Sequence, residues 1–132
     1  MTTRFIAQDV ATKAAVHIIA GTARVPGRLS ALADQAVRAG TSVALNIAEA
    51  RGRSGKDRTY HFRVAYGSAR EADAAIAILC ASNAGCANRL RSAQSQLDEV
   101  RAMLWRILHP GVPPQQHEPS NRSTPDASAA RS

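Results

Sequence analysis

The chain contains few of the residues that characterise several common protein classes. Its 132 residues include two cysteines, two phenylalanines, two tyrosines and one tryptophan. Cys80 and Cys86 lie six positions apart and no secretory signal precedes them, so we expect both to be reduced, cytosolic and structural. With 27 alanines in place of large side chains, the core buries little surface per residue. Such a chain needs close helix packing and often a second subunit, so we expect a homo-oligomer.

Long apolar runs and catalytic motifs are also missing. No stretch approaches the 18 consecutive apolar residues of a membrane-spanning helix, so we expect no membrane partner and a cytoplasmic location. There is no Walker loop, glycine-rich dinucleotide turn, Glu-x-x-His ligand pair or nucleophile-plus-base pattern. We therefore predict a protein that is not an enzyme and holds no cofactor or metal. An enzymatic alternative would need a bound metal or an open pocket around Glu49 and Glu71.

Acidic residues are outnumbered by basic ones. The chain has 17 Lys and Arg against 10 Asp and Glu, a formal net charge of +7 and a pI near 10.7. Fifteen of the cations are arginine, whose planar guanidinium favours bidentate contact with phosphate or carboxylate. This balance indicates a nucleic acid or another anionic partner. A GC-rich genome also raises the alanine and arginine content, so composition by itself does not decide the question.

Strand-like alternation of useful length is absent, whereas four helical patterns are present. Gly21 ends the first pattern, Gly52 ends the second, and Asn83 with Gly85 ends the third. Short connections between long amphipathic helices are typical of antiparallel neighbours. The predicted fold is therefore all-α, an up-down antiparallel four-helix bundle, with helices over about residues 6–23, 28–50, 54–83 and 90–107.

Each pattern carries an apolar stripe at three- and four-residue spacing. Gly40 interrupts the second pattern at a loss of about 1 kcal/mol relative to alanine, which indicates close packing there. Ser54 followed by Asp57 resembles a capping box at the start of the third. His17 falls on an apolar face and is predicted to be a core histidine with a satisfied ring. The expected core stripes are Ile6, Val10, Ala14, His17 and Ile18; Leu29, Leu32, Ala36, Ala39, Val43 and Ile47; Phe62, Ala65, Ala69, Ala72, Ile76 and Leu79; and Leu90, Ala93, Leu97, Val100, Leu104 and Ile107.

The composition changes after His109. Residues 110–132 hold five of the six prolines, and Val112 is their one large aliphatic side chain. A segment of this kind cannot bury enough apolar surface to offset its ordering entropy. We expect a bundle over residues 1–109 and a disordered Pro/Ser-rich tail over residues 110–132. Because the tail has two arginines and two carboxylates, the net charge of +7 falls on the bundle.

One face of the third helix alternates cations with a tyrosine. At 100° per residue, five side chains fall within about 80° of each other. Cations on such a face can follow a phosphate backbone while the ring stacks on a base. The alternative is a plain solvated face on which Arg70 pairs with Asp73 to little energetic effect. The five residues are Lys56, Thr59, Arg63, Tyr66 and Arg70.

A second set of polar residues lies on facing sides of the second and third helices. Small residues on the third helix let another backbone approach, so we expect this side to be buried. Glu49 and Glu71 would then be buried carboxylates, which are costly unless paired, and Arg38 is the natural cation for one of them. We predict an internal hydrogen-bonded network. Its members are Arg38, Ser42, Asn46, Glu49, Ser68 and Glu71.

Two segments resemble a known family. The run Q-A-V-R-A-G-T-S-V-A-L-N-I-A-E-A (Gln35–Ala50), followed by R-G-R-S and by A-Y-G-S-A-R-E (Ala65–Glu71), resembles the bacterial four-helix-bundle family of ribosomal RNA intervening-sequence proteins. The resemblance covers roughly residues 7–107. Its signature positions fall on Arg38, Ser42, Asn46, Glu49, Gly67, Ser68 and Glu71, which we interpret as packing positions.

The resemblance implies an up-down bundle that assembles into a ring-like homopentamer. It also implies kinship with the accessory subunits of diversity-generating retroelements, which bind nucleic acid and a reverse transcriptase. Two positions depart from the family pattern. Ala44 replaces a proline, so the second helix should run through with less kink. Ala50 replaces a glycine, so that helix should extend nearer to Gly52.

These observations lead to one functional hypothesis and one rival. The hypothesis is a non-enzymatic, homo-oligomeric bundle that binds RNA or another nucleic acid through phosphate contacts. The rival is a protein-interaction adaptor, such as an accessory subunit of a reverse transcriptase, whose basic surface docks an acidic partner. Charge does not separate the two because both would use arginine. The predicted binding residues are Arg51, Arg53, Lys56, Arg58, Arg63, Tyr66 and Arg70.

Overall fold

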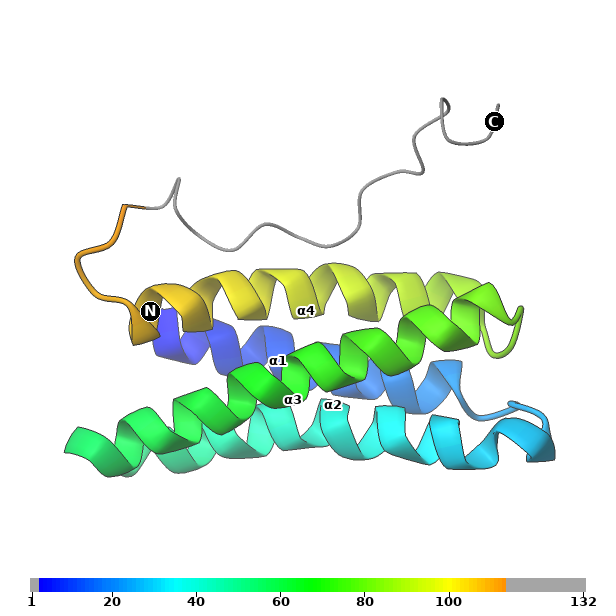
Figure 1. The fold of residues 1–132 in the computed structure, drawn as a ribbon, viewed down its shortest axis with the longest axis horizontal. Helices are drawn as coiled ribbons and strands as arrows, with labels where there is room; N and C mark the ends of the chain where they lie inside the picture. The colour runs from blue at the N-terminus through cyan, green and yellow to red at the C-terminus, as the bar shows by residue number, and fades with distance from the viewer. Residues whose placement is uncertain (1–2, 114–132) are drawn as a thin grey trace, which may run out of the picture.

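Four α-helices form an up-down bundle in the computed structural model of the chain, which describes residues 3–113 (Figure 1). Helix α1 packs against α2 and α4, and α3 packs against the same two helices, so consecutive helices are neighbours. This arrangement confirms the fold expected from the periodicity. From position 114 onward, the predicted tail lies outside the described residues. The elements are α1 (Thr3–Gly21), a short 3-10 helix η1 (Gly27–Leu29), α2 (Ser30–Arg51), α3 (Gly55–Ala81) and α4 (Ala87–Leu108).

The helix ends follow the turn residues of the sequence. Helix α2 runs through to Arg51 with Gly52 as its C-cap. Helix α3 is followed by Asn83 and Gly85, which both have positive φ (54° and 79°), the conformation that favours these two residue types. Ser54 is the N-cap of α3 in an extended conformation, but its side chain makes no capping hydrogen bond. The reciprocal capping box is therefore incomplete at this helix start.

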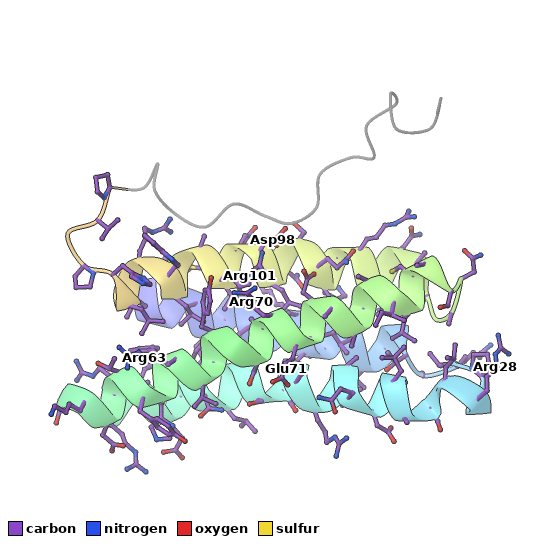
Figure 2. The ribbon with its side chains drawn as sticks, viewed as in Figure 1. Arg28, Arg63, Arg70, Glu71, Asp98 and Arg101 are labelled. Atoms are coloured by element: carbon purple, nitrogen blue, oxygen red, sulfur yellow. The ribbon has the colours of Figure 1, made fainter. Side chains whose placement is uncertain are left out.

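Charged side chains lie mostly on the outside of the four helices (Figure 2). Arg101 of α4 is the charged residue that is buried within the described range, with 8% of its surface exposed. Its Nη2 donates to Oδ1 of Asp98 one turn earlier, at 3.3 Å. A buried guanidinium requires such a partner because its desolvation is costly.

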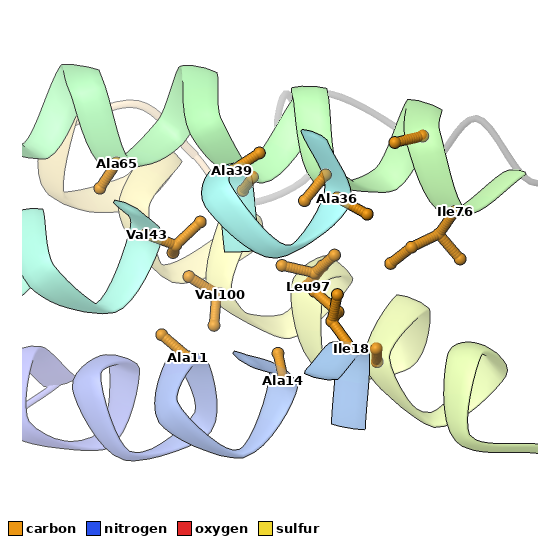
Figure 3. Packing of buried hydrophobic residues seen from close by; sticks show 14 of the residues in the cluster. Ala11, Ala14, Ile18, Ala36, Ala39, Val43, Ala65, Ile76, Leu97 and Val100 are labelled. Atoms are coloured by element: carbon orange, nitrogen blue, oxygen red, sulfur yellow. The ribbon is translucent and has the colours of Figure 1, made fainter. Parts of the chain in front are cut away.

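The core is built from small and medium-sized side chains of all four helices (Figure 3). On α2, α3 and α4 the buried residues match the predicted stripes, with Leu29, Leu32 and Ile107 partly buried at the ends. Ile18 and Gly40 are in direct contact, since a Cβ at position 40 would lie 2.5 Å from Cδ1 of Ile18. The close packing expected at Gly40 is confirmed.

The stripe predicted for α1 is wrong in part. Ile6 is 41% exposed and Val10 is only partly buried, whereas Ala7 and Ala11 are fully buried. Both faces of this helix carry apolar residues, so periodicity by itself did not fix which one turns inward. The alanine face packs inward because small side chains let α1 approach its neighbours closely. His17 is half-buried, and its Nδ1 lies 2.9 Å from Oε1 of Gln96 on α4.

Candidate nucleic-acid interface

The connection between α2 and α3 forms one end of the bundle and carries the basic run. Residues 46–63 contain five cations and two carboxylates, which leaves a net charge of +3. We call this region the hairpin end, defined by Glu49, Arg51, Arg53, Lys56, Asp57, Arg58 and Arg63. The sequence predicted all five cations as binding residues, and the structure places them in different electrostatic settings.

Arg53 lies between two carboxylates of its own chain. Its Nη1 donates to Oδ2 of Asp57 at 2.7 Å, and its Nη2 and Nε approach Oε2 of Glu49 at 3.3 and 3.4 Å. Asp57, and after it Glu49, raise the pKa of Arg53 above its usual value. The guanidinium stays charged, but the two carboxylates partly cancel its positive potential. Two carboxylates of the same chain therefore partly neutralise Arg53, one of the predicted binding residues.

Two further arginines are held by neutral oxygen atoms. Arg51 donates from Nη1 to Oε1 of Gln8 on α1. Arg58 is half-buried and donates from Nε to the backbone carbonyl of Arg53 at 2.7 Å. An amide or carbonyl oxygen orients a guanidinium without cancelling its charge. The hydrogen bond to the carbonyl of Arg53 therefore leaves the positive charge of Arg58 in place at the hairpin end.

Lys56 and Arg63 are exposed on α3 (Arg63 is labelled in Figure 2). Within residues 3–113, no hydrogen bond or ion pair engages either side chain. Exposed cations of this kind are available to phosphate oxygens without first breaking an internal hydrogen bond or ion pair. They are the predicted residues best suited to bind an anion.

Two tyrosines of α3 differ in exposure, and the more exposed one is not the one predicted to stack on bases. Tyr66 is half-buried against the core, and Arg70, one turn further along α3, is exposed. Tyr60 is 60% exposed and packs edge-on against His61, with ring centroids 5.2 Å apart. The ring of Tyr60 is therefore exposed, and in the sequence it lies four residues after Lys56 and three before Arg63. The predicted basic face of the third helix included Tyr66 but not Tyr60, although the position of Tyr60 inside the basic run was a usable signal.

Four polar side chains join α2 to α3. Ser42 and Ser68 hydroxyls lie 2.9 Å apart, and Nδ2 of Asn46 donates to Oγ of Ser42 at 3.0 Å and to its carbonyl at 2.9 Å. Oδ1 of Asn46 lies 3.1 Å from Nδ1 of His61, which donates when that nitrogen carries the proton. The sequence predicted three of these residues as network members, and His61 joins them.

The two glutamates predicted as buried members of this network are at the surface. Glu49 faces Arg53, and Glu71 accepts a 3.5 Å hydrogen bond from Gln35, which itself accepts from Arg38 at 3.2 Å. Arg38 therefore reaches Glu71 only through an amide. The reason is helix geometry: at 100° per residue, Glu49 lies about 120° around α2 from the buried Val43. Asn46 lies only about 60° from it and stays in the interface.

An open depression on the outside of α2 includes Glu49 but not Glu71. Its lining residues are Leu45, Ala48, Glu49, Gly52 and Arg53. Within the part of the chain that the structure describes, no three His, Cys, Asp or Glu side chains converge as metal ligands would. The lining of this depression therefore does not bring the two glutamates together.

None of the described helices is long and apolar enough to cross a membrane. The cysteines are both unbonded, with Cys80 half-buried near the end of α3 and Cys86 exposed at the start of α4. Burial raises the pKa of the Cys80 thiol, and the charge of Arg91 acts in the opposite direction. Neither thiol is bonded, as predicted, but the exposure of Cys86 does not fit the structural role expected for it.

Comparisons with known proteins agree on the fold. No curated protein matches the chain in sequence. The crystal structure of a protein of unknown function from the S23 ribosomal protein family of Bacteroides thetaiotaomicron superimposes with a TM-score of 0.71, at 20% identity, over 81% of this chain and 98% of that one. Residues 4–106 match the family described as 23S rRNA-intervening sequence protein. With its four-helix bundle and these matched residues, the chain belongs to the 23S rRNA-intervening sequence protein family.

Proposed function

We propose that this protein is a non-enzymatic, homo-oligomeric bundle that binds RNA, or another nucleic acid, through its hairpin end. The observation that carries the proposal is the exposure of Lys56 and Arg63, which no contact within the described chain engages, beside Arg51 and Arg58. The family name, which refers to 23S rRNA, supports RNA as the ligand.

Binding rests on phosphate contacts. Each guanidinium presents a planar set of donors to phosphate oxygens, and the exposed ring of Tyr60 can stack on an unpaired base. These contacts depend on the charge and shape of the nucleic acid, so binding is not specific for base sequence. In an oligomer the hairpin end is repeated, so contacts that are weak singly combine into useful avidity.

Exposed apolar residues support the homo-oligomer. Leu45 is 65% exposed, and Val16, Ile19 and Ile78 each expose half or more of their surface. Val16 and Ile19, three residues apart, lie on one side of α1, where a second copy of the chain can cover them. The family resemblance suggests five copies.

The second candidate is a protein-interaction adaptor, such as an accessory subunit of a reverse transcriptase. The observation in its favour is Leu45, which lines the open depression on α2 together with Ala48 and Gly52. An aliphatic side chain beside a depression can anchor a partner protein. In this reading the cations near the depression steer an acidic partner toward it.

The test measures the affinity of the full chain for a fluorescent 20-base-pair RNA duplex between 50 and 300 mM salt. About four phosphate contacts at the hairpin end contribute between about −3 and −4 to the slope of log affinity against log salt. The double variant Lys56→Gln/Arg63→Gln removes two contacts, so its slope is flatter by about 2.

The matched control is Lys13→Gln/Arg38→Gln, which removes two exposed cations from the middle of α1 and α2 and retains the parent slope. A parent affinity that hardly changes with salt contradicts the proposal. Pull-downs from nuclease-treated lysate separate the two candidates, since an adaptor retains its protein partner without nucleic acid and an RNA-binding protein does not.

A further inference from the structure

The end of the bundle opposite the hairpin end is formed by two connections that pack on each other. In Figure 1 the connection from α1 to α2 and the connection from α3 to α4 lie together at this end. The backbone N–H of Cys86 donates to the carbonyl of Gly21 at 2.8 Å. A Cβ at Gly85 would lie 2.6 Å from the same carbonyl oxygen and 3.6 Å from Val25, so only glycine fits this junction. The two connections therefore form one fixed surface.

Four exposed arginines surround this junction: Arg24, Arg28, Arg89 and Arg91. Arg24 and Arg28 flank Val25, which packs toward Gly85. The Cβ of Arg89 lies 3.4 Å from the position that a Cβ of Gly21 would take. Arg91 is close enough to the last turn of α3 for its charge to act on Cys80. We call this surface the loop end.

The loop end lacks the internal carboxylates that offset charge at the hairpin end. Residues 10–33 and 74–97, which supply both connections and the adjoining helix turns, contain no Asp or Glu. Within residues 3–113, no hydrogen bond or ion pair engages any of the four guanidiniums. Four like charges at one end of the bundle produce a positive field that favours a polyanion.

Four acidic residues lie between the two ends of the bundle, whereas Asp34 lies in the second turn of α2 near the loop end, and Glu49 and Asp57 lie at the hairpin end. Glu71 and Asp73 fall in the middle of α3, and Asp98 and Glu99 fall in the middle of α4. Figure 2 shows Glu71 and Asp98 at mid-length, with Arg28 at one end and Arg63 toward the other. The basic surfaces are thus separate, about 33 Å apart along the 22 residues of α2.

We infer that the loop end is a second phosphate-binding surface, so that each bundle contacts nucleic acid at both of its ends. This inference rests on the proposed function, which uses the hairpin end only. Arginine is suited to this role because a guanidinium bonds two phosphate oxygens at once and remains charged at every working pH.

The experiment uses the full chain and the same 20-base-pair RNA duplex. In the variant Arg24→Gln/Arg28→Gln/Arg89→Gln/Arg91→Gln, the slope of log affinity against log salt is flatter than in the parent by about 3 to 4. Replacing the four arginines by lysine keeps the charge and restores most of the slope. Lys13→Gln/Arg38→Gln again serves as the control, and circular dichroism verifies that each variant remains helical.

The outcomes separate this inference from the proposed function. If the glutamine variant keeps the parent slope and affinity, the inference is overturned, while the dependence on Lys56 and Arg63 still supports the hairpin end. If the loop-end variant loses slope and the hairpin-end variant does not, the inference stands and the hairpin end is the wrong site. A third outcome is that poly-glutamate binds the parent, that the loop-end variant no longer binds it, and that duplex binding is the same in both. In that case the loop end docks an acidic protein, and the inference is overturned.

Discussion

Gly40 of α2 lies directly against Ile18 of α1, so closely that a Cβ at position 40 would fall 2.5 Å from Cδ1 of the isoleucine. Ile18 is fully buried and so has little room to move. The contact explains why a residue that weakens a helix interior occupies the middle of α2. It also determines how near α1 and α2 approach each other in an alanine-rich core.

Gly40→Ala is expected to destabilise the protein. Overpacking against Ile18 costs about 1 to 3 kcal/mol, and the better helix propensity of alanine returns about 1 kcal/mol. The net loss is therefore about 1 kcal/mol, measured by denaturant unfolding. Gly67→Ala is the control, because nothing lies within 4 Å of a Cβ at that position of α3, and it should gain about 0.5 to 1 kcal/mol. In an Ile18→Val background Gly40→Ala should become neutral or stabilising, and equal effects in both backgrounds would refute the contact.

Asn46→Ala is expected to weaken the junction of α2 and α3. The change leaves the hydroxyl of Ser42 and Nδ1 of His61 without their amide partner in a half-buried position. The free energy of unfolding should fall by about 1 to 2 kcal/mol. Gln35→Ala removes an exposed hydrogen bond of 3.5 Å to Glu71 and should change it by less than about 0.5 kcal/mol. Equal effects of the two changes would contradict the role assigned to the network.

Asp57→Asn combined with Glu49→Gln is expected to strengthen nucleic-acid binding. Both carboxylates hold Arg53, and the pKa of its guanidinium would move back toward the usual value without the group losing its proton. The gain is therefore an exposed charge, and the slope of log affinity against log salt should steepen by about 1. Asp9→Asn, which releases Lys13 on α1, is the control and should leave the slope unchanged. An unaltered slope in the double variant would place Arg53 outside the binding surface.

The two thiols should react with a maleimide at different rates. Cys86 is exposed and should be labelled first, whereas burial raises the pKa of Cys80 and so lowers its thiolate fraction at a given pH. The pH at which labelling of Cys80 becomes rapid is therefore higher than for an exposed cysteine. Because Arg91 lowers the pKa of Cys80, Arg91→Gln should slow that labelling further. Single variants Cys80→Ser and Cys86→Ser, followed by mass spectrometry from pH 7 to 9, give each rate, and faster labelling of Cys80 would be the contrary result.

Leu45→Glu is expected to reduce the oligomer mass measured by light scattering. Leu45 is 65% exposed in the single bundle and lines the depression on α2. A carboxylate there would be buried without a partner in any interface that covers it. Ala31→Glu places the same charge at an exposed position nearer the start of α2 and should leave the mass unchanged. A mass unaffected by Leu45→Glu would mean that the oligomer uses another surface.

Local periodicity was enough to predict most of the bundle. The stripes of α2, α3 and α4 repeat at three and four residues, and each was recognised because a helix places such positions on one side whatever its neighbours are. Glycine and asparagine marked the helix ends for the same local reason. In α1 the rule was insufficient, because Ile6 and Val10 on one face compete with Ala7 and Ala11 on the next.

The sequence also grouped the basic residues of the hairpin end, since they are close along the chain. It did not distinguish Arg53, which two carboxylates hold, from Arg63, which has no carboxylate partner among residues 3–113. The exposure of Glu49 and Glu71 could not be predicted from the sequence either, because it depends on the rotation of α2 and α3 about their axes once they pack.

The sequence by itself therefore determined four helices, their order and the inward side of three of them, all of which follow from contacts within a few residues. Only the tertiary structure decided which arginines have a carboxylate partner and which connections pack against each other. Gly21 and Gly85 are 64 residues apart in the chain, and their contact gathers four arginines at the loop end. Local sequence patterns do not predict such a contact, because it depends on how separate helices dock against each other.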